Sequence, residues 1–289
     1  MRPVLHELLE LLRLERLEVD LFRGQSQDLG WGAVYGGQVV GQALSAAAQT
    51  VPQDRPVHSL HAYFLRQGDA KRPIVYRVSR DRDGRSFTSR SVTAIQHGEP
   101  ILTLSASFQA EEPGFEHQDP PPAVPGPEGL ATEGELLRRL ADRIPAPLRE
   151  QALGERPIEI RPVNPHNVLH PDRRPAVRHV WYRAVDPLPD DPALHRYLLA
   201  YASDFHFLVT SMQPHGVSWL SPGMQVASLD HAMWFHRAPR VDSWLLYVID
   251  SPAASGGRGL VRGRFYDTAG NLVASTAQEG LIRMRKGAS

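Results

Sequence analysis

Two pairs of matching stretches, set at one constant offset along the chain, constrain its fold more than any other feature of the sequence. The stretch SLHAYFLR at 59–66 recurs as SLDHAMWFHR at 228–237, and SASFQ at 105–109 recurs as ASTAQ at 274–278. Ser59 and Ser228 are as far apart in the chain as Gln109 and Gln278. Between them, DGR at 83–85 is echoed by GGR at 256–258, at a slightly larger offset. Such spacing predicts two copies of one structural unit.

The composition narrows the class of protein. With 289 residues, of which 42% are apolar and 22% charged, the chain can form about two globular domains. Its formal net charge is zero, so we expect neither nucleic acid nor an anionic membrane as partner. It has no cysteine, which excludes a thiol nucleophile and is typical of the cytoplasm. No apolar run predicts a membrane span, and the amphipathic, glutamate-bearing segment 1–16 is interpreted as a surface helix rather than a targeting peptide.

Hydrophobic periodicity predicts the same element order in both copies, a helix followed by a meander of strands. In the first copy we expect a buried helix at 38–48 and strands at 57–65, 74–80, 86–96 and 101–109. In the second we expect a strand at 177–185, a helix at 190–212, and strands at 224–237, 243–251, 259–267 and 272–283. A proline-rich stretch and a short helix at 132–150 separate them. The predicted division is 1–112, a linker at 113–156, and 157–289.

Several motifs resemble the acyl-CoA thioesterase II family, and the resemblance covers residues 8–283. They are YGGQ at 35–38, LHAYF at 60–64, DGRSF at 83–87, DHAMWFH at 230–236 and QEG at 278–280. The resemblance implies an α+β double hotdog fold, in which two units share one continuous antiparallel sheet. It also implies an enzyme that hydrolyses fatty acyl-CoA, needs no cofactor and forms a homo-oligomer, a dimer or tetramer.

The family's catalytic set of Asp, Ser or Thr, and Gln falls here on Asp204, Ser228 and Gln278. A thioester carbonyl is already electrophilic, so hydrolysis depends on a well-placed water. Asp204 can accept the proton of that water, while Ser228 and Gln278 hold it. We expect Asp204 to lie among apolar neighbours such as Phe205 and Phe207, since burial would raise its pKa and make it a better base.

Other residues are candidates for substrate binding. Gly36 and Gly37 begin the predicted buried helix, where free backbone N–H groups can face a developing oxyanion. Arg258 is a candidate contact for a coenzyme A phosphate. His166 and His170 have the i, i+4 spacing of metal ligands, but prolines surround them and no acidic partner is near, so we expect no metal site.

The repeat predicts one active site per chain. Aligning the helices places Gly37 opposite Asp204, while Ser59 and Gln109 match Ser228 and Gln278. The first copy would then keep two polar groups and lack the carboxylate. Among the histidines, His206 is expected to face away from Asp204, and His231 is interpreted as structural because it matches His61 of the first copy.

Two other functions stay open at this point. A hotdog enoyl-CoA hydratase or dehydratase would need a His facing an acidic residue, which the spacing of Asp204 and His206 does not favour. A non-catalytic acyl-CoA-binding protein would not need all three polar groups of the second copy. Both alternatives can be separated from a thioesterase by assay.

Overall fold

The computed structural model describes residues 1–30, 32–143, 149 and 153–285. Within these ranges, thirteen strands form one sheet in which every pairing is antiparallel. The order is β1-β2-β4-β5-β6-β3-β10-β13-β12-β11-β8-β7, and β9 pairs with β13 beside this path. The strands are β1 (Glu15–Glu18), β2 (Leu21–Gly24), β3 (Val57–Phe64), β4 (Ile74–Asp83), β5 (Phe87–Gln96), β6 (Glu99–Gln109), β7 (Ile158–Pro162), β8 (Val177–Ala184), β9 (Met224–Ser228), β10 (Asp230–Phe235), β11 (Leu245–Ser255), β12 (Arg258–Tyr266) and β13 (Leu272–Met284).

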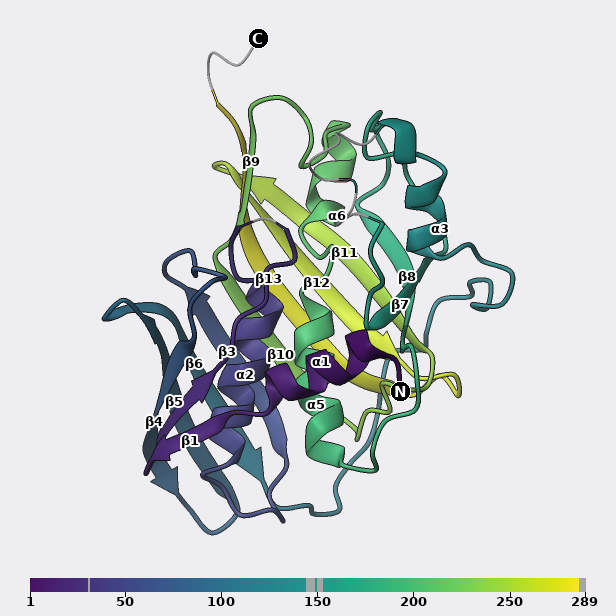
Figure 1. The fold of residues 1–289 in the computed structure, drawn as a ribbon. Helices are drawn as coiled ribbons and strands as arrows, with labels where there is room; N and C mark the ends of the chain where they lie inside the picture. Colours follow the sequence, from purple (N-terminus) through teal and green to yellow (C-terminus); the bar gives the residue numbers. More distant parts are fainter. Residues whose placement is uncertain (31, 144–148, 150–152, 286–289) are drawn as a thin grey trace.

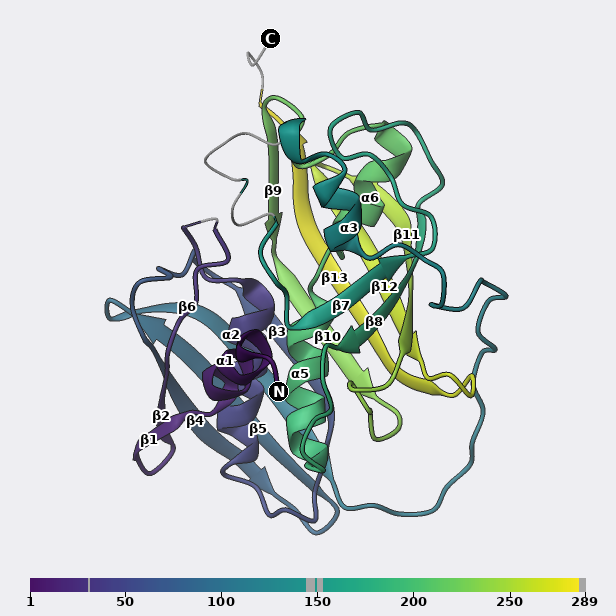
Figure 2. The same cartoon turned by 45° about the vertical axis from the view of Figure 1, so that its right-hand side comes forward.

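The two halves of the molecule join through β3 and β10. These strands pair antiparallel, with Leu60 opposite Met233, and the sheet continues from one half into the other. The predicted continuous sheet is therefore confirmed. Figures 1 and 2 show the first half and the second half as two curved parts of this sheet, with the helices on its inner side.

Two central helices, α2 (Gly36–Ala48) and α5 (Pro192–Ser203), lie against each other inside the curved sheet. Every residue of α2 from Gly37 to Ala47 is buried, as the small and apolar residues of this stretch predict. The N-terminal helix α1 (Pro3–Leu12) packs on α2, and Leu5 and Leu8 are buried in the core. One face of α1 thus belongs to the core, and the segment predicted as a surface helix is only half exposed.

The prediction of one continuous helix over residues 190–212 is wrong in the middle of this segment. The first helix α5 ends at Ser203, and a turn follows in which His206 has a left-handed backbone, with φ of 57°. The chain then forms α6 (Val209–Met212) and the 3-10 turn η2 (Gln213–His215). A left-handed residue cannot continue a right-handed helix. The break leaves Asp204 as the C-cap of α5 instead of inside a long helix.

The predicted strand 224–237 is also interrupted. β9 ends at Ser228 and pairs only with β13, whereas β10 begins at Asp230 and pairs with both β13 and β3. At the break, the carboxylate of Asp230 accepts a hydrogen bond from the N–H of Glu279 at 2.6 Å. This side-chain contact replaces a regular bond of the ladder and places Ser228 at a strand end.

The segment between the halves runs over the outside of the second half. The indole N–H of Trp181 donates to the carbonyl of Pro125, and Gln118 bonds to the backbone of Gly270 and Leu272. Thr132 then caps α3 (Glu133–Arg138) in a capping box with Glu135, and η1 (Ala141–Arg143) follows. The rest of the helix predicted at 132–150 lies mostly outside the described residues.

Over the part of the chain that the structure describes, no helix has the length and apolar character required to cross a bilayer.

Candidate active site

Asp204 lies where the C-terminus of α5 meets the N-terminus of α2. The N–H of Gly37 donates to its carboxylate. A Cβ atom on Gly36 would lie 2.8 Å from Asp204 Oδ2, and one on Gly37 would lie 2.3 Å from the carbonyl oxygen of Tyr201. Both glycines are therefore required by close approach: Gly36 to the carboxylate and Gly37 to the backbone of α5. The tight contact between the helices brings a helix N-terminus to the carboxylate.

Burial raises the pKa of Asp204 above its ordinary value of 3.8. The electrostatic effect of His231 and the hydrogen bonds from Gln278 and Gly37 oppose this shift without cancelling it. Phe205 stacks on the ring of Tyr35, with 4.6 Å between ring centroids, and adds apolar surface beside the carboxylate. The expectation that burial raises the pKa of Asp204 is confirmed, and the raised pKa makes the carboxylate a better proton acceptor.

The side chains of Ser228 and Gln278 lie beside the carboxylate of Asp204. The amide nitrogen of Gln278 donates to Ser228 Oγ at 2.7 Å and also bonds to Asp204. The side chain of Gln278 points to the inner face of β13 and is 1% exposed. The structure thus brings together all three residues that the sequence predicts, from the end of α5, the end of β9 and the middle of β13.

A cavity of about 760 Å³ opens over the three side chains. Its wall contains Asp204, Ser228, Gln278 and Gly36, together with apolar side chains from both halves and the guanidinium-bearing Arg66. Because the wall includes residues of both units, neither half could form this site alone. Such a cavity, apolar with a few converging polar groups, is typical of a small-molecule site.

His231, interpreted from the sequence as structural, contacts the trio directly. Its Nδ1 lies 2.6 Å from Gln278 Oε1, and its Nε2 lies 2.9 Å from the Oγ of Ser203. His61 is exposed on the outer face of β3, and its register partner in β10 is Ala232. The match with His61 was therefore misleading. The alternation of His231, Met233 and Phe235 on the inner face of β10 is the signal that could have found it.

A second cavity, of about 220 Å³, lies beside the first and shares four wall residues with it. The shared residues are Phe205, His206, Val209 and Trp219. His206 forms an ion pair with Glu133 of α3 at 2.8 Å. Burial alone would raise the pKa of Glu133, but the charge and hydrogen bond of His206, together with the charges of Arg178 and Arg156, outweigh it, so that the pKa is lowered.

The remaining candidates do not join the site. Arg258 is paired with Glu279 at 2.9 Å and is absent from the wall of the cavity. Its place in the β11–β12 hairpin leaves it apart from the trio. Among the described residues, no three side chains are grouped as a metal site would require, and His166 instead lies in the wall of the second cavity.

Comparisons with known proteins show the family of this chain. Residues 26–109 match the family described as acyl-CoA thioesterase N-terminal domain, and residues 147–281 match the family described as acyl-CoA thioesterase. Acyl-CoA thioesterase 2 of Haemophilus influenzae is 46% identical over 283 residues, which are 98% of this chain and 99% of that protein. The chain belongs to the acyl-CoA thioesterase II family. It is accordingly an enzyme of the thioesterase class.

Three further proteins are similar to this chain, in sequence, in fold or in both. The human protein named acyl-coenzyme A thioesterase 8 is 44% identical, over 95% of this chain and 88% of that protein. The crystal structure of an acyl-CoA thioesterase II from Mycobacterium marinum superimposes with a TM-score of 0.79 at 43% identity, covering 97% of this chain and 99% of that one. A hotdog protein from Alicyclobacillus acidocaldarius, 19% identical, has a TM-score of 0.78 and shows the fold alone. The predicted double hotdog fold is confirmed.

The register of this sheet corrects the alignment of the two copies. When the DGR turn at 83–85 is aligned with the GGR turn at 256–258, Leu260 becomes the counterpart of Phe87. Phe87 of β5 pairs with Gln109, whereas Leu260 of β12 pairs with Glu279. Gln109 therefore matches Glu279, and the buried Phe108 takes the place of Gln278. The amide of Gln109 faces outward and donates to Glu112. A shift of one residue moves a strand side chain to the opposite face, so the predicted match was wrong.

The same correction applies to the other two matches. Ser59 pairs with Ser107, and Ala232 pairs with Ala277, so Ser59 matches Ala232 and not Ser228. The helices α2 and α5 end at the C-caps Gln49 and Asp204. Gln49, not Gly37, is the counterpart of Asp204. The first half therefore lacks the whole trio and not only its carboxylate.

Proposed function

We propose that the protein hydrolyses fatty acyl-CoA thioesters, with Asp204 as general base and with Ser228 and Gln278 holding the attacking water. The observation that carries this proposal is the meeting of a half-buried carboxylate, a hydroxyl and an amide on one cavity at the start of α2. These groups can bind a water molecule on one side and leave the opposite side open to a thioester carbonyl.

In the proposed reaction, water adds to the thioester carbonyl carbon and gives its proton to the carboxylate of Asp204. Negative charge then develops on the carbonyl oxygen. The N–H of Gly36, at the first position of α2, is the donor we assign to it, since the N–H of Gly37 already bonds to Asp204. The carbon–sulfur bond breaks as the tetrahedral intermediate collapses. The proton held by Asp204 passes to the departing thiolate, and the products are a fatty acid and free coenzyme A.

We place the acyl chain in the second cavity. Its wall is largely apolar and includes Leu136 and Leu137 of α3 together with Ile158 and Ile160 of β7. Because the two cavities share Phe205 and neighbouring residues, a chain that starts at the trio can continue into it. Coenzyme A would then lie toward the open side of the larger cavity. Arg66 is paired with Glu99 at 2.9 Å but, unlike Arg258, lies on the wall of this cavity, and it replaces Arg258 as the candidate phosphate contact.

The test is an assay of the purified protein with palmitoyl-CoA and a thiol-reactive dye, followed by an assay with an enoyl-CoA. We expect thiol release that depends on enzyme concentration, and no hydration of the enoyl double bond. Hydration without thiol release would favour the hydratase alternative. Binding of acyl-CoA without either reaction would indicate a non-catalytic binding protein, and both outcomes would overturn the proposal.

Two expectations from the sequence stay predictions: a location in the cytoplasm, and association into a homodimer or homotetramer. Light scattering at micromolar concentration tests the second. A mass of 32.2 kDa, that of a single chain, would contradict association.

A further inference from the structure

Gln278 carries two different groups on one amide, and the site works only if each faces the correct neighbour. Its nitrogen donates to Ser228 Oγ at 2.7 Å and bonds to Asp204, whose ionised carboxylate can only accept. Its oxygen therefore points the other way. A flip of the amide would place its oxygen against the carboxylate and remove both donors from the site. Something must hold the amide in the productive orientation.

His231 occupies the position from which the amide can be held. The imidazole is 0% exposed, and its Nδ1 lies 2.6 Å from Gln278 Oε1. An amide oxygen has no proton to give, so Nδ1 must carry the hydrogen of this bond. On the other side of the ring, Nε2 lies 2.9 Å from Ser203 Oγ, which is also fully buried. Ser203 is the last residue of α5 and directly precedes Asp204.

We propose that His231 is a positioning residue for this reaction, which fixes the amide of Gln278 so that its nitrogen faces Asp204 and Ser228. The inference rests on the proposed function, because it assigns His231 a role through Gln278 and not through the substrate. The contacts form one line from three buried residues to two half-buried ones: Ser203, His231 and Gln278, and then Ser228 with Asp204. Ser203 holds the ring at one end, and the reacting groups lie at the other.

The first experiment replaces His231 and measures kcat and KM separately. His231→Leu keeps an apolar side chain of similar bulk but has no donor, and we expect kcat to fall about 10- to 100-fold with KM within about twofold. His231→Asn keeps an N–H near the Nδ1 position, and we expect it to recover at least about fivefold of that loss in kcat. His61→Asn, on the exposed face of the neighbouring strand, is the matched control and should retain wild-type kcat. Thermal unfolding identifies any variant that fails to fold.

The second experiment is a double-mutant cycle with Gln278→Ala. If His231 acts only through Gln278, replacing His231 by Leu in the Gln278→Ala background should lower kcat by less than about twofold further. Additive losses would show that His231 acts independently of the amide, and would overturn the inference while leaving thioesterase activity in place. An inactive wild-type protein would instead contradict the proposed function itself.

The third experiment reads the proton on the ring and does not depend on activity. With ¹⁵N-labelled histidine, the His231 signals can be assigned by their loss in His231→Asn. We expect a protonated Nδ1 whose hydrogen exchanges slowly with water, because the group is buried. An Nδ1 without a proton would mean that the amide is turned the other way, and would refute the assignment even if His231→Leu were inactive.

Discussion

The two central helices end in the same way but lead into opposite environments. α2 ends at Gln49 and α5 at Asp204, and both C-caps have right-handed helical backbone angles. Gln49 lies on the wall of a cavity of about 480 Å³ that is lined by arginines and by side chains such as Thr50 and Asp83, to which they bond. Beyond Ser203, the Asp204 carboxylate lies on the wall of a cavity and its pKa is raised by burial. The comparison teaches that the C-terminal end of the same kind of helix can have a structural role or carry a reactive group, according to the side chains that surround it.

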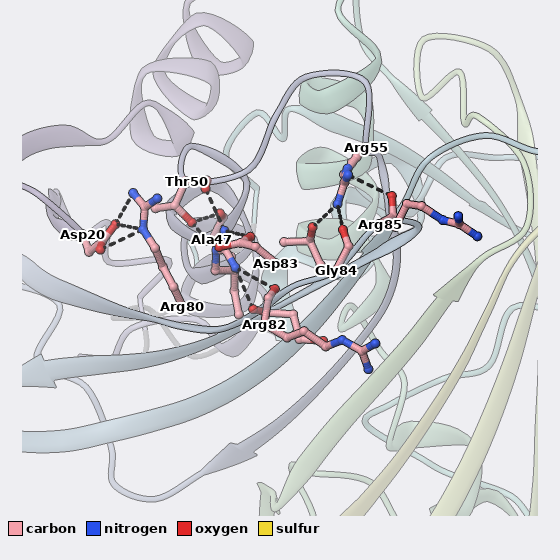
Figure 3. A network of polar contacts seen from close by, with 12 residues as sticks. Asp20, Ala47, Thr50, Arg55, Arg80, Arg82, Asp83, Gly84 and Arg85 are labelled. Carbon is pink, nitrogen blue, oxygen red and sulfur yellow. Dashed lines mark hydrogen bonds and ion pairs between the residues drawn. The ribbon is translucent and has the colours of Figure 1, made fainter.

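Arginine side chains surround the C-terminal end of α2 in the first half. Arg90 is 1% exposed and donates to Thr50 Oγ1 and Thr50 O, to the carbonyls of Arg82 and Ser89, and to Asp83 at 2.6 Å. Figure 3 shows this network around Thr50, Arg82 and Asp83. Nearby, Arg55 donates to the carbonyls of Gly84 and Arg85 and to the hydroxyl of Thr88. A guanidinium group has donors but no acceptor, so these arginines cannot take a proton from a water molecule.

The largest expected difference between the C-terminal ends of α5 and α2 is the effect of a substitution there on kcat. Asp204→Asn should lower kcat by about 1,000-fold or more, because it removes the general base while keeping size and hydrogen-bonding reach. The acyl-CoA affinity should stay within a few fold, because the lost group acts on water. Gln49→Ala, at the matching end of α2, should leave kcat unchanged, as should Gln109→Ala on the outer face. A large loss in either control would show that the first half contributes to catalysis.

The water-holding pair should give the next largest effect. Ser228→Ala and Gln278→Ala should each lower kcat about 10- to 1,000-fold, since each removes one hydrogen bond in the site. The double variant should be only slightly less active than the weaker single variant, because both residues act on the same water. Steady-state kinetics of the three proteins decide this, and wild-type turnover in either single variant would remove that residue from the site.

Arg90→Met tests whether the network at the C-terminal end of α2 has a structural role, and the quantity measured is the free energy of unfolding. The variant loses the hydrogen bonds of a buried guanidinium and leaves carbonyl groups without donors, so we expect the free energy of unfolding to fall by about 2–4 kcal/mol. The kcat of the folded variant should stay within about twofold of wild type. Urea unfolding and an assay at low temperature provide both values. Lost activity with unchanged stability would mean that the first-half network serves the reaction.

The smallest effect concerns stability against pH. The pKa of Asp204 is raised in the folded protein, so its ionisation costs stability once the pH rises through the ordinary value of 3.8 and toward the folded pKa. Asp204→Asn should therefore be more stable than wild type by about 1 kcal/mol at neutral pH, and this advantage should vanish below about pH 3.8. Melting curves across pH test this. In the wild type, kcat/KM should fall as acid protonates the same carboxylate.

The sequence by itself determined the repeat, the buried helix α2 and the strand meander of each half, and its motifs led to the three residues of the trio through their resemblance to a known family. These features depend on local periodicity and on motifs a few residues long, which are visible without knowing any long-range contact. The partial burial of Asp204 was also predictable, because Phe205 and Phe207 follow it closely in the chain.

Only the tertiary structure decided the register between strands, the end of α5 and the role of His231. Gln109 and Phe108 differ by one position, and the sequence match chose the residue on the wrong face because side chains alternate between the two faces along a strand. The left-handed His206 and the break before Asp230 depend on contacts with distant segments, Glu133 and Glu279. His231 resembles any buried histidine until β10 and β13 pair and bring it to Gln278.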